Sequence, residues 1–120
     1  MKTYKINIMN NVKLLVVVFL ILAISSGCSK SDNTTQTPGA SEVFIQSFAF
    51  TPPAITVSVN TTITWTNKDA AAHTVTSDIG LFDSGNLNTN ETFSRKFTTT
   101  GTFNYHCTNH PTMTAKVIVQ

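Results

Sequence analysis

Charged side chains are scarce in this chain of 120 residues, because lysine, arginine, aspartate and glutamate together make up only 12% of it. Three of its eight basic residues, Lys2, Lys5 and Lys13, lie in the first 27 residues, so the rest of the chain carries five basic and six acidic groups. A chain so close to neutral lacks the concentrated positive charge that attracts a phosphate backbone. The composition therefore gives no electrostatic argument for nucleic acid as a partner.

Long hydrophobic runs are also lacking, and the single run that exists is short. It covers residues 12–24, follows Lys2 and Lys5, contains Lys13 near its start and is succeeded by the small residues 25–27. A membrane-spanning helix needs about 20 apolar residues. A basic start, a shorter apolar run and a small-residue end are instead typical of an export signal. We therefore predict that residues 1–27 form a signal peptide.

Cysteine occurs only twice, at positions 28 and 107. The small residues followed by Cys28 resemble a bacterial lipobox, in which the cysteine is lipidated and becomes the new N-terminus. A diacylated cysteine inserts more than one acyl chain, which is enough for stable anchoring. We expect a lipoprotein on a bacterial membrane that faces the periplasm or the cell exterior. The alternatives are an ordinary signal peptide with an unmodified Cys28, or a disulfide between Cys28 and Cys107.

Large apolar side chains are missing from residues 29–41, so this stretch cannot contribute to a core. Such a composition is typical of a flexible polar tether. The lipidated cysteine and the linker are therefore expected over residues 28–41. The remaining length allows one compact domain, which we place at residues 42–120.

Helical periodicity is lacking in residues 42–120, where short stretches of alternating apolar and polar residues follow one another. Ile55 and Val57, and later Ile63 and Trp65, alternate with threonine and serine, a period of two that is typical of strands with one buried face. The expected strands lie at residues 43–50, 55–59, 62–66, 73–76, 92–97, 102–107 and 114–119. About seven short strands predict an all-β fold, an antiparallel sandwich or barrel.

Arg95 does not fit the simplest version of this pattern. It lies between Phe93 and Phe97 on the same face of its expected strand. That face is therefore either close to a rim of the sandwich or partly solvated, and the sequence leaves both possibilities open.

The side chains that carry chemistry gather near the C-terminus. Cys107, His110 and Met113 follow one another at intervals of three, and His73 stands at the start of an expected strand. Thiolate, imidazole and thioether form a soft, mixed donor set that is typical of a type 1 copper site. Alternation in the strand at 102–107 places Cys107 on the inward side and His106 on the outward side, so His106 is not expected to be a ligand.

Two other kinds of site compete with copper at this spacing. Cys107 and His110 also suit zinc, although methionine is a poor zinc ligand and only one thiolate is available here. A Cys–His nucleophilic pair is the enzymatic alternative, but it needs an accessible thiolate, whereas Cys107 is expected to point inward. A multicopper oxidase is excluded, because one domain with three histidines cannot hold a trinuclear cluster.

Three segments together, at residues 82–85, 90–94 and 101–117, resemble the cupredoxin family of plastocyanin and azurin. The short Cys-x2-His-x2-Met loop is most similar to that of amicyanin, and the resemblance covers essentially all of residues 42–120. Two features depart from the family pattern. Asn109 stands where a proline is common, and the interval between His73 and Cys107 is compact.

The resemblance implies a Greek-key sandwich in which one copper ion is bound by His73, Cys107 and His110, with Met113 as a weak axial ligand. It also implies hydrogen bonds to the Cys107 sulfur from backbone N–H groups near Thr74 and Asn109.

The implied activity is single-electron transfer by a monomeric carrier that is not an enzyme. Redox proteins such as a cytochrome, an oxidase or a reductase are expected to dock briefly near His110, on an apolar patch that includes Ala72, Pro111 and Thr112. The alternative function is copper binding and delivery on the same fold, without electron shuttling.

Overall fold

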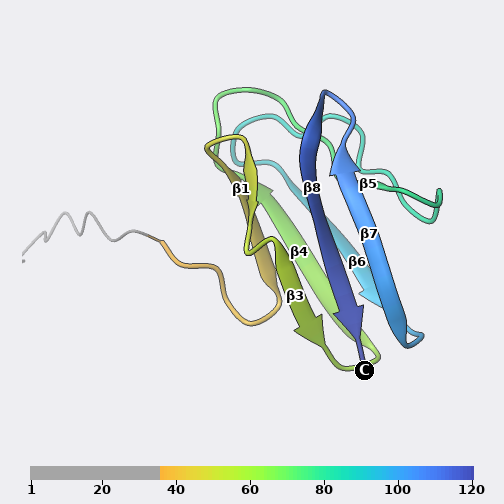
Figure 1. Cartoon of the computed structure of the whole chain (residues 1–120). Coiled ribbons are helices and arrows are strands. Elements are labelled where there is room, and N and C mark those ends of the chain that lie inside the picture. The colour runs from red at the N-terminus through yellow and green to blue at the C-terminus, as the bar shows by residue number, and fades with distance from the viewer. Residues whose placement is uncertain (1–35) are drawn as a thin grey trace, which may run out of the picture. The chain divides into compact units, whose positions relative to one another are not determined.

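The computed structural model describes residues 36–120, and these residues form a sandwich of two four-stranded sheets (Figure 1). The strands are β1 (Glu42–Gln46), β2 (Ala49–Thr51), β3 (Ala54–Val57), β4 (Thr61–Asn67), β5 (Thr76–Ser77), β6 (Thr92–Phe97), β7 (Gly101–Cys107) and β8 (His110–Val119). One sheet has the order β2-β1-β4-β6 and the other has the order β3-β8-β7-β5. The predicted all-β sandwich is therefore confirmed.

No helix that is long and apolar enough to cross a membrane occurs in the part of the chain that the structure describes. The predicted signal peptide at residues 1–27 and the predicted lipidation site Cys28 lie outside the described residues. The domain boundary predicted at Glu42 stays a prediction. Two residues just before this boundary already make backbone hydrogen bonds with the domain. The carbonyl of Gly39 accepts from the N–H of Glu42 at 3.1 Å, and the carbonyl of Ser41 accepts from the N–H of Thr64 at 3.0 Å.

The sheets are mixed, which differs from the antiparallel pairing expected from the sequence. Strand β1 runs parallel to β4, and β3 runs parallel to β8, whereas the other neighbours are antiparallel. Alternation has the same period of two in both kinds of pairing, so the sequence pattern predicts a strand without predicting the direction of its neighbour. The chain changes sheets after β2, where Pro52 and Pro53 interrupt the strand.

The stretch predicted as one strand at residues 43–50 is in fact a hairpin, so that prediction was wrong. Ser47 and Phe48 have positive φ angles of 54° and 58°, and Gln46 pairs with Ala49 across the turn. Two-residue hairpin turns with left-handed geometry usually contain glycine, asparagine or aspartate. Because neither Ser47 nor Phe48 is of that kind, the local sequence contains no signal for the reversal.

The strands near the candidate ligands also differ from the expected ones. Of the predicted strand at residues 73–76 only Thr76 belongs to a strand, β5, and His73 makes only an isolated bridge to Leu87. Conversely, β8 begins at His110, four residues earlier than expected, after an irregularity in the register at His106 and Cys107. The ligand loop is therefore a very tight connection between two neighbouring strands.

Aromatic side chains fill the space between the two sheets around Trp65, which is fully buried on β4. The Trp65 ring lies 5.6 Å from Tyr105 and 5.7 Å from Phe93, measured between ring centroids. Burial raises the pKa of Tyr105 to about 12, because ionisation of the phenol is unfavourable away from water. The core reaches the metal-ligand candidates, since Cys107 and Met113 belong to the same buried cluster.

The position of Arg95 is decided by these aromatic rings. Its guanidinium carbon lies 5.0 Å from the centroid of Phe82 and 5.8 Å from that of Phe97, and the residue is half-buried. A guanidinium can cover an aromatic face while its polar edge stays near water. The face that carries Arg95 is therefore a partly solvated edge of the core.

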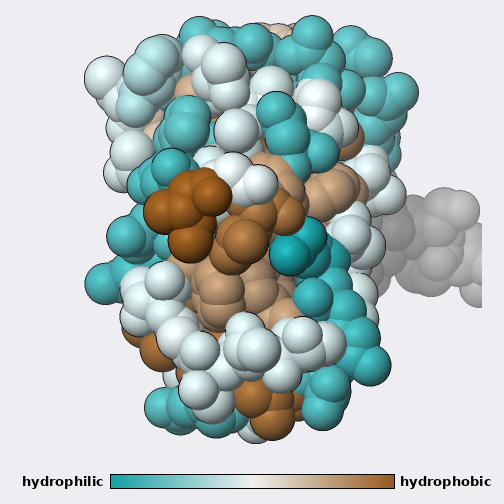
Figure 2. Space-filling model, turned by 90° about the vertical axis from the view of Figure 1, so that its right-hand side faces the viewer, coloured by the Kyte–Doolittle hydropathy of each residue, from teal (hydrophilic) through white to brown (hydrophobic). Residues whose placement is uncertain are grey.

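Apolar side chains also gather on the face of the molecule shown in Figure 2, which is the side that carries β5 and β7 in Figure 1. The segment after β5 contributes two exposed side chains, Ile79 and Leu81. Their exposed fractions are 72% and 45%. A third exposed apolar side chain, Phe48, belongs to the β1–β2 turn and contacts the rings of His73 and His110.

Candidate metal centre

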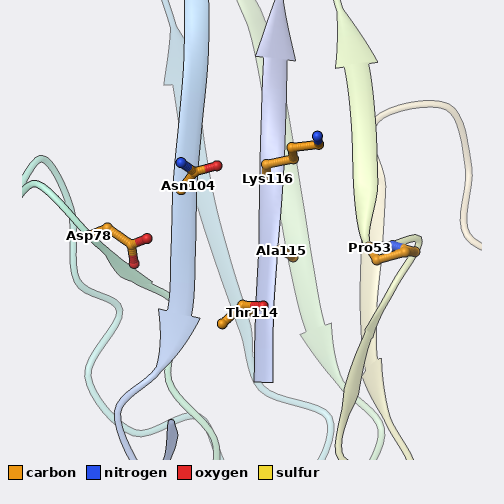
Figure 3. Close-up of a pocket in the computed structure, with 6 residues that line it drawn as sticks. All are labelled: Pro53, Asp78, Asn104, Thr114, Ala115 and Lys116. Carbon is orange, nitrogen blue, oxygen red and sulfur yellow. The ribbon is translucent and has the colours of Figure 1, made fainter. Parts of the chain in front are cut away.

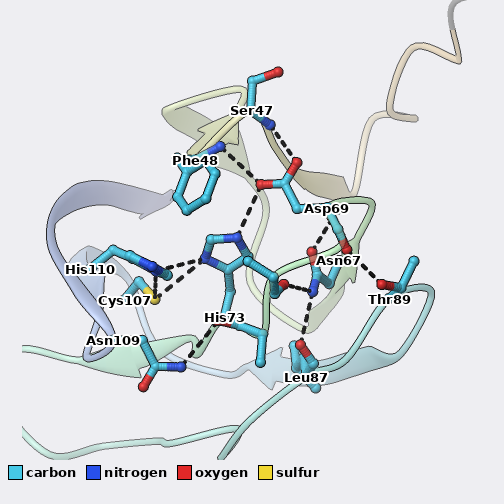
Figure 4. A network of polar contacts seen from close by, with 12 residues as sticks. Ser47, Phe48, Asn67, Asp69, His73, Leu87, Thr89, Cys107, Asn109 and His110 are labelled. Atoms are coloured by element: carbon cyan, nitrogen blue, oxygen red, sulfur yellow. Dashed lines mark hydrogen bonds and ion pairs between the residues drawn. The ribbon is translucent and has the colours of Figure 1, made fainter.

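Three donor side chains meet at one end of the sandwich (Figure 4). Cys107 ends β7, His110 begins β8, and His73 lies between β4 and β5. The Cys107 Sγ atom is 3.7 Å from His73 Nδ1 and 3.6 Å from His110 Nδ1, and the two Nδ1 atoms are 3.2 Å apart. Three donors arranged around one ion, at metal–ligand distances of about 2.0–2.3 Å, have separations of this size.

The donor set and its burial favour copper over the alternatives. His73 and Cys107 are fully buried, His110 is half-buried, and Met113 is 5% exposed and close to the other three. A buried thiolate is poorly placed to attack a substrate, which argues against the Cys–His nucleophile. Zinc would use the thioether of Met113 poorly, whereas a long, weak bond to methionine is usual for type 1 copper. The residues present therefore fit a single copper ion.

The thiol of Cys107 is free within the described part of the chain, and the backbone holds it in place. The N–H of Thr74 donates a hydrogen bond to Cys107 Sγ over 3.3 Å. The hydroxyl of Thr74 in turn accepts a 2.8 Å hydrogen bond from the N–H of Thr108. Through these two contacts Thr74, which follows His73, is bonded both to the Cys107 sulfur and to the next residue of the ligand loop, Thr108.

Asn109, the position where the family commonly has proline, contributes through its side chain. Its amide nitrogen donates to the Ala72 carbonyl at 3.1 Å and to Asn86 Oδ1 at 2.9 Å. These bonds tie the ligand loop to the segment before His73 and to the segment between β5 and β6. The residue thus stabilises the loop by hydrogen bonding, whereas a proline restricts it through its ring.

The segment that carries His73 is organised by the fully buried side chain of Asn67. The Asn67 amide group donates to the carbonyls of Ala71 and Leu87, each at 2.8 Å, and its carbonyl oxygen accepts from the N–H of Asp69 at 2.9 Å. Leu87 also exchanges two backbone hydrogen bonds with His73. The sequence alone does not reveal this role of Asn67, because an asparagine before a turn is usually only a turn residue.

Replacing Asn67 by alanine is expected to lower the free energy of unfolding by about 2–4 kcal/mol, because three hydrogen bonds between its buried amide and the backbone are lost. Urea unfolding measures the effect. The matched control is Asn109→Ala, which removes an amide with two partners from an exposed position and should cost less than about 1 kcal/mol. Equal losses in the two variants would contradict the importance of the buried amide.

Asp69 lies between the buried histidine and the surface. Its carboxylate accepts hydrogen bonds from the N–H groups of Ser47 (2.7 Å) and Phe48 (2.9 Å) and from His73 Nε2 (3.0 Å). Burial by itself raises the pKa of Asp69, but the two backbone hydrogen bonds and the contact with His73 outweigh it and hold the pKa below its ordinary value. The ionised carboxylate is therefore the stable form.

His106 lies outside the donor cluster. Its Nδ1 atom is 2.6 Å from Asp78 Oδ1, and both side chains are partly exposed. Asp78 also borders a pocket on the outer surface of the sheet, where side chains of β7 and β8 point away from the core (Figure 3). The pocket is lined by Pro53, Asp78, Asn104, Thr114, Ala115 and Lys116. It contains none of the candidate ligands.

The docking patch expected near His110 stays a prediction, and one further side chain lies beside the two histidine rings. Pro111 and Thr112 are exposed, and Ala72 is half-buried. The further side chain, Phe48, was not predicted and is 55% exposed. Its ring contacts both histidine rings edge to face, with centroid distances of 5.3 Å to His73 and 5.0 Å to His110. Nothing in the local sequence links residue 48 with the ligands, because only the hairpin turn brings it there.

The family model for a cupredoxin-like domain matches residues 14–119. The chain belongs to the cupredoxin family. It is 36% identical over 87 residues to amicyanin-alpha of Methylorubrum extorquens, an alignment that covers 68% of this chain and 73% of the relative. Amicyanin of Paracoccus denitrificans is also 36% identical, over 68% of this chain and 66% of that protein.

Solved cupredoxin structures agree with the fold. A purple cupredoxin from Nitrosopumilus maritimus superposes with a TM-score of 0.64 and 30% identity, over 67% of this chain and 99% of that one. An oxidised amicyanin variant gives a TM-score of 0.65 and 32% identity, over 72% and 87% of the two chains. Other amicyanin variants among the similar structures are in the Cu(I) state.

Membership of the cupredoxin family confirms two expectations from the sequence. The cofactor is one copper ion, which agrees with the donor set of His73, Cys107, His110 and Met113. The protein belongs to a class of electron carriers and is not an enzyme.

Proposed function

We propose that this cupredoxin is a single-electron carrier whose type 1 copper is held by His73, Cys107 and His110, with Met113 as the weak axial ligand. The observation that supports this most strongly is the fully buried Cys107 sulfur, which has two imidazole nitrogens at 3.6–3.7 Å that are themselves 3.2 Å apart. Bound copper supplies a one-electron change between Cu(II) and Cu(I). Everything else in the mechanism depends on how the chain holds the donors.

The protein's part is to keep the donors in nearly the same place in both oxidation states. Cys107 is fixed by β7 and by the N–H of Thr74. His73 is fixed by its backbone bonds to Leu87 and by the carboxylate of Asp69. A site whose donors cannot rearrange has little reorganisation to undergo when an electron arrives or leaves, which favours fast transfer.

Electrons are proposed to pass through the half-buried ring of His110 at the end of the sandwich. The proposed docking patch consists of the small or apolar residues Ala72, Pro111 and Thr112 together with Phe48, whose ring contacts His110. An uncharged patch of modest size suits brief encounters better than a permanent complex. The proposed partners are redox proteins such as a cytochrome, an oxidase or a reductase, which dock transiently on a monomer.

The proposed place of action is outside the cytoplasm, in agreement with the amicyanin-like family assignment and with the export signal expected from the sequence. We further propose that Cys28 carries the lipid anchor to a bacterial membrane and that residues 28–41 form the tether. Mass spectrometry of the membrane-extracted protein tests this. A diacylated N-terminal Cys28 supports the anchor, and an unmodified or absent Cys28 contradicts it.

The detergent-extracted full chain, loaded with one equivalent of Cu(II), is expected to show intense visible absorption from thiolate-to-copper charge transfer. Stopped-flow mixing with a reduced cytochrome should bleach this absorption rapidly, because the chain holds the donors in place and little rearrangement would accompany electron transfer. A colourless Cu(II) complex would overturn the type 1 site. A coloured complex that accepts electrons only slowly would instead favour the copper-delivery alternative.

A further inference from the structure

One carboxylate, that of Asp69, connects a fully buried candidate ligand, His73, with an exposed aromatic side chain near the centre, Phe48 (Figure 4). It accepts from His73 Nε2 on one side and from the N–H groups of Ser47 and Phe48 on the other. Its side chain is itself only 15% exposed.

The contact with Asp69 selects one tautomer of His73. A neutral imidazole has a single N–H, and an ionised carboxylate can only accept a hydrogen bond. The proton of His73 is therefore on Nε2, which leaves the lone pair of Nδ1 free. Nδ1 is also the atom that faces the other donors, at 3.7 Å from Cys107 Sγ and 3.2 Å from His110 Nδ1.

The same carboxylate compensates for an unfavourable backbone conformation in the β1–β2 turn. Ser47 and Phe48 both have left-handed φ angles, which side chains other than glycine and asparagine seldom adopt. Two successive N–H groups in this conformation converge and form a concave anion site. Asp69 occupies that site, with N···O distances of 2.7 and 2.9 Å.

The turn determines where the Phe48 ring lies. From its left-handed position the ring packs edge to face against His73 and His110, while 55% of the residue stays exposed. An aromatic ring at this place limits the access of water to both imidazoles. If the turn lost its anion, the backbone at Phe48 would relax toward a more common conformation and the ring would leave the histidines.

We propose that Asp69 is a positioning residue that acts in two directions: it holds His73 with Nδ1 free for the metal, and it anchors the turn that keeps Phe48 over the two histidine rings. The proposal rests on the proposed function, since it takes His73 and His110 as copper ligands. It predicts that the metal ligand and the partner-facing ring respond together when Asp69 is changed.

The first test uses the full chain without metal, at a pH above the range in which histidine ordinarily titrates. Nitrogen-15 NMR should show His73 protonated on Nε2 in the parent protein, and a mixture of tautomers in Asp69→Asn. Hydrogen exchange at the N–H groups of Ser47 and Phe48 should become at least about tenfold faster in the same variant, because a neutral amide holds the turn more weakly than a carboxylate. Asp69→Ala should enlarge both effects if it folds.

The matched control is Asp78→Asn, which removes a carboxylate from a different histidine. Asp78 contacts His106 at 2.6 Å, but neither residue belongs to the donor cluster. This variant should leave the tautomer of His73 and the exchange at Ser47 and Phe48 unchanged. An Asp69→Asn protein with the parent tautomer and the parent exchange rates would overturn the proposal.

The second test uses the copper-loaded protein and its reduction potential. A nearby carboxylate favours Cu(II), so Asp69→Asn should raise the potential by at least about 59 mV, the one-electron equivalent of a tenfold change in the Cu(I) to Cu(II) ratio. Phe48→Leu keeps the carboxylate and should change the potential less, while it slows electron exchange between two copies of the protein. An unchanged potential in Asp69→Asn would contradict the coupling to His73.

The two proposals fail in different ways. If the parent protein shows no charge-transfer absorption with Cu(II), the proposed function is wrong whatever Asp69 does. If the parent protein is coloured but the Asp69 and Asp78 variants behave alike in the metal-free test, only the positioning role is wrong.

Discussion

Replacing Cys107 by serine is expected to abolish the charge-transfer absorption of the copper-loaded protein and to lower its affinity for copper more than about 100-fold. The lower bound comes from outer-shell changes, which alone cost 10–100-fold. Cys107 supplies the only thiolate among the described residues, and the band arises from that thiolate. A serine hydroxyl at the same place is a harder donor that stays protonated at neutral pH, so it can neither bind strongly nor give the colour.

The geometry around Cys107 makes this replacement a clean test. The side chain is fully buried, and the N–H of Thr74 that donates to sulfur at 3.3 Å can donate to the serine oxygen as well. The fold should therefore persist, and far-UV circular dichroism of the variant checks that it does.

A second histidine near the cysteine supplies the control. His106→Gln changes the residue next to Cys107 but leaves the donor cluster intact, because His106 contacts Asp78 instead. This variant should keep the visible absorption and the copper affinity of the parent. Retained colour in Cys107→Ser, or lost colour in His106→Gln, would contradict the assigned ligand set.

Replacing Trp65 by alanine is expected to lower the free energy of unfolding by about 3–5 kcal/mol, the usual cost of removing a large buried aromatic side chain. A domain of this size has a total stability of about 5–10 kcal/mol, so the variant should be close to unfolding at room temperature. Trp65 is fully buried at the centre of the core, where Tyr105, Phe93 and Phe82 surround its ring. Neighbours held on two separate sheets cannot collapse into the space that the indole leaves.

Urea unfolding of the metal-free protein measures this loss without a contribution from bound copper. Trp65→Phe keeps most of the apolar contact and should cost clearly less than alanine. Ile79→Ala is the surface control, since Ile79 is 72% exposed and its truncation should change stability by no more than about 0.5 kcal/mol. Comparable losses at positions 65 and 79 would contradict the central place of Trp65 in the core.

Much of the centre could be predicted because it is local in sequence. Cys107, His110 and Met113 are separated by a single turn between adjacent strands, and their donor types already indicate copper. Alternation within one strand was sufficient to set His106 apart from Cys107. The strand pattern likewise predicted an all-β sandwich, since a period of two indicates a half-buried strand in any sheet.

Other features could not be predicted because they depend on contacts between distant segments. Whether β1 pairs parallel or antiparallel with β4 is decided by how the two sheets close over Trp65. The alternation of apolar and polar residues is the same in both kinds of pairing and cannot predict the direction. The hairpin at Ser47 and Phe48 has unsuitable turn residues and exists because a carboxylate more than 20 residues away accepts its N–H groups. Tertiary hydrogen bonds here outweigh local preference.

Spacing within one short loop thus determined which metal this chain is built for, because ligand chemistry and strand alternation are properties of neighbouring residues. Folding alone decided how the fourth donor and its surroundings are arranged. His73 reaches the site through the buried amide of Asn67, and Phe48 covers it through the carboxylate of Asp69. The bonds from Asn67 to Leu87 and from Phe48 to Asp69 join residues 20 and 21 positions apart, and only the closed sandwich brings them within hydrogen-bonding distance.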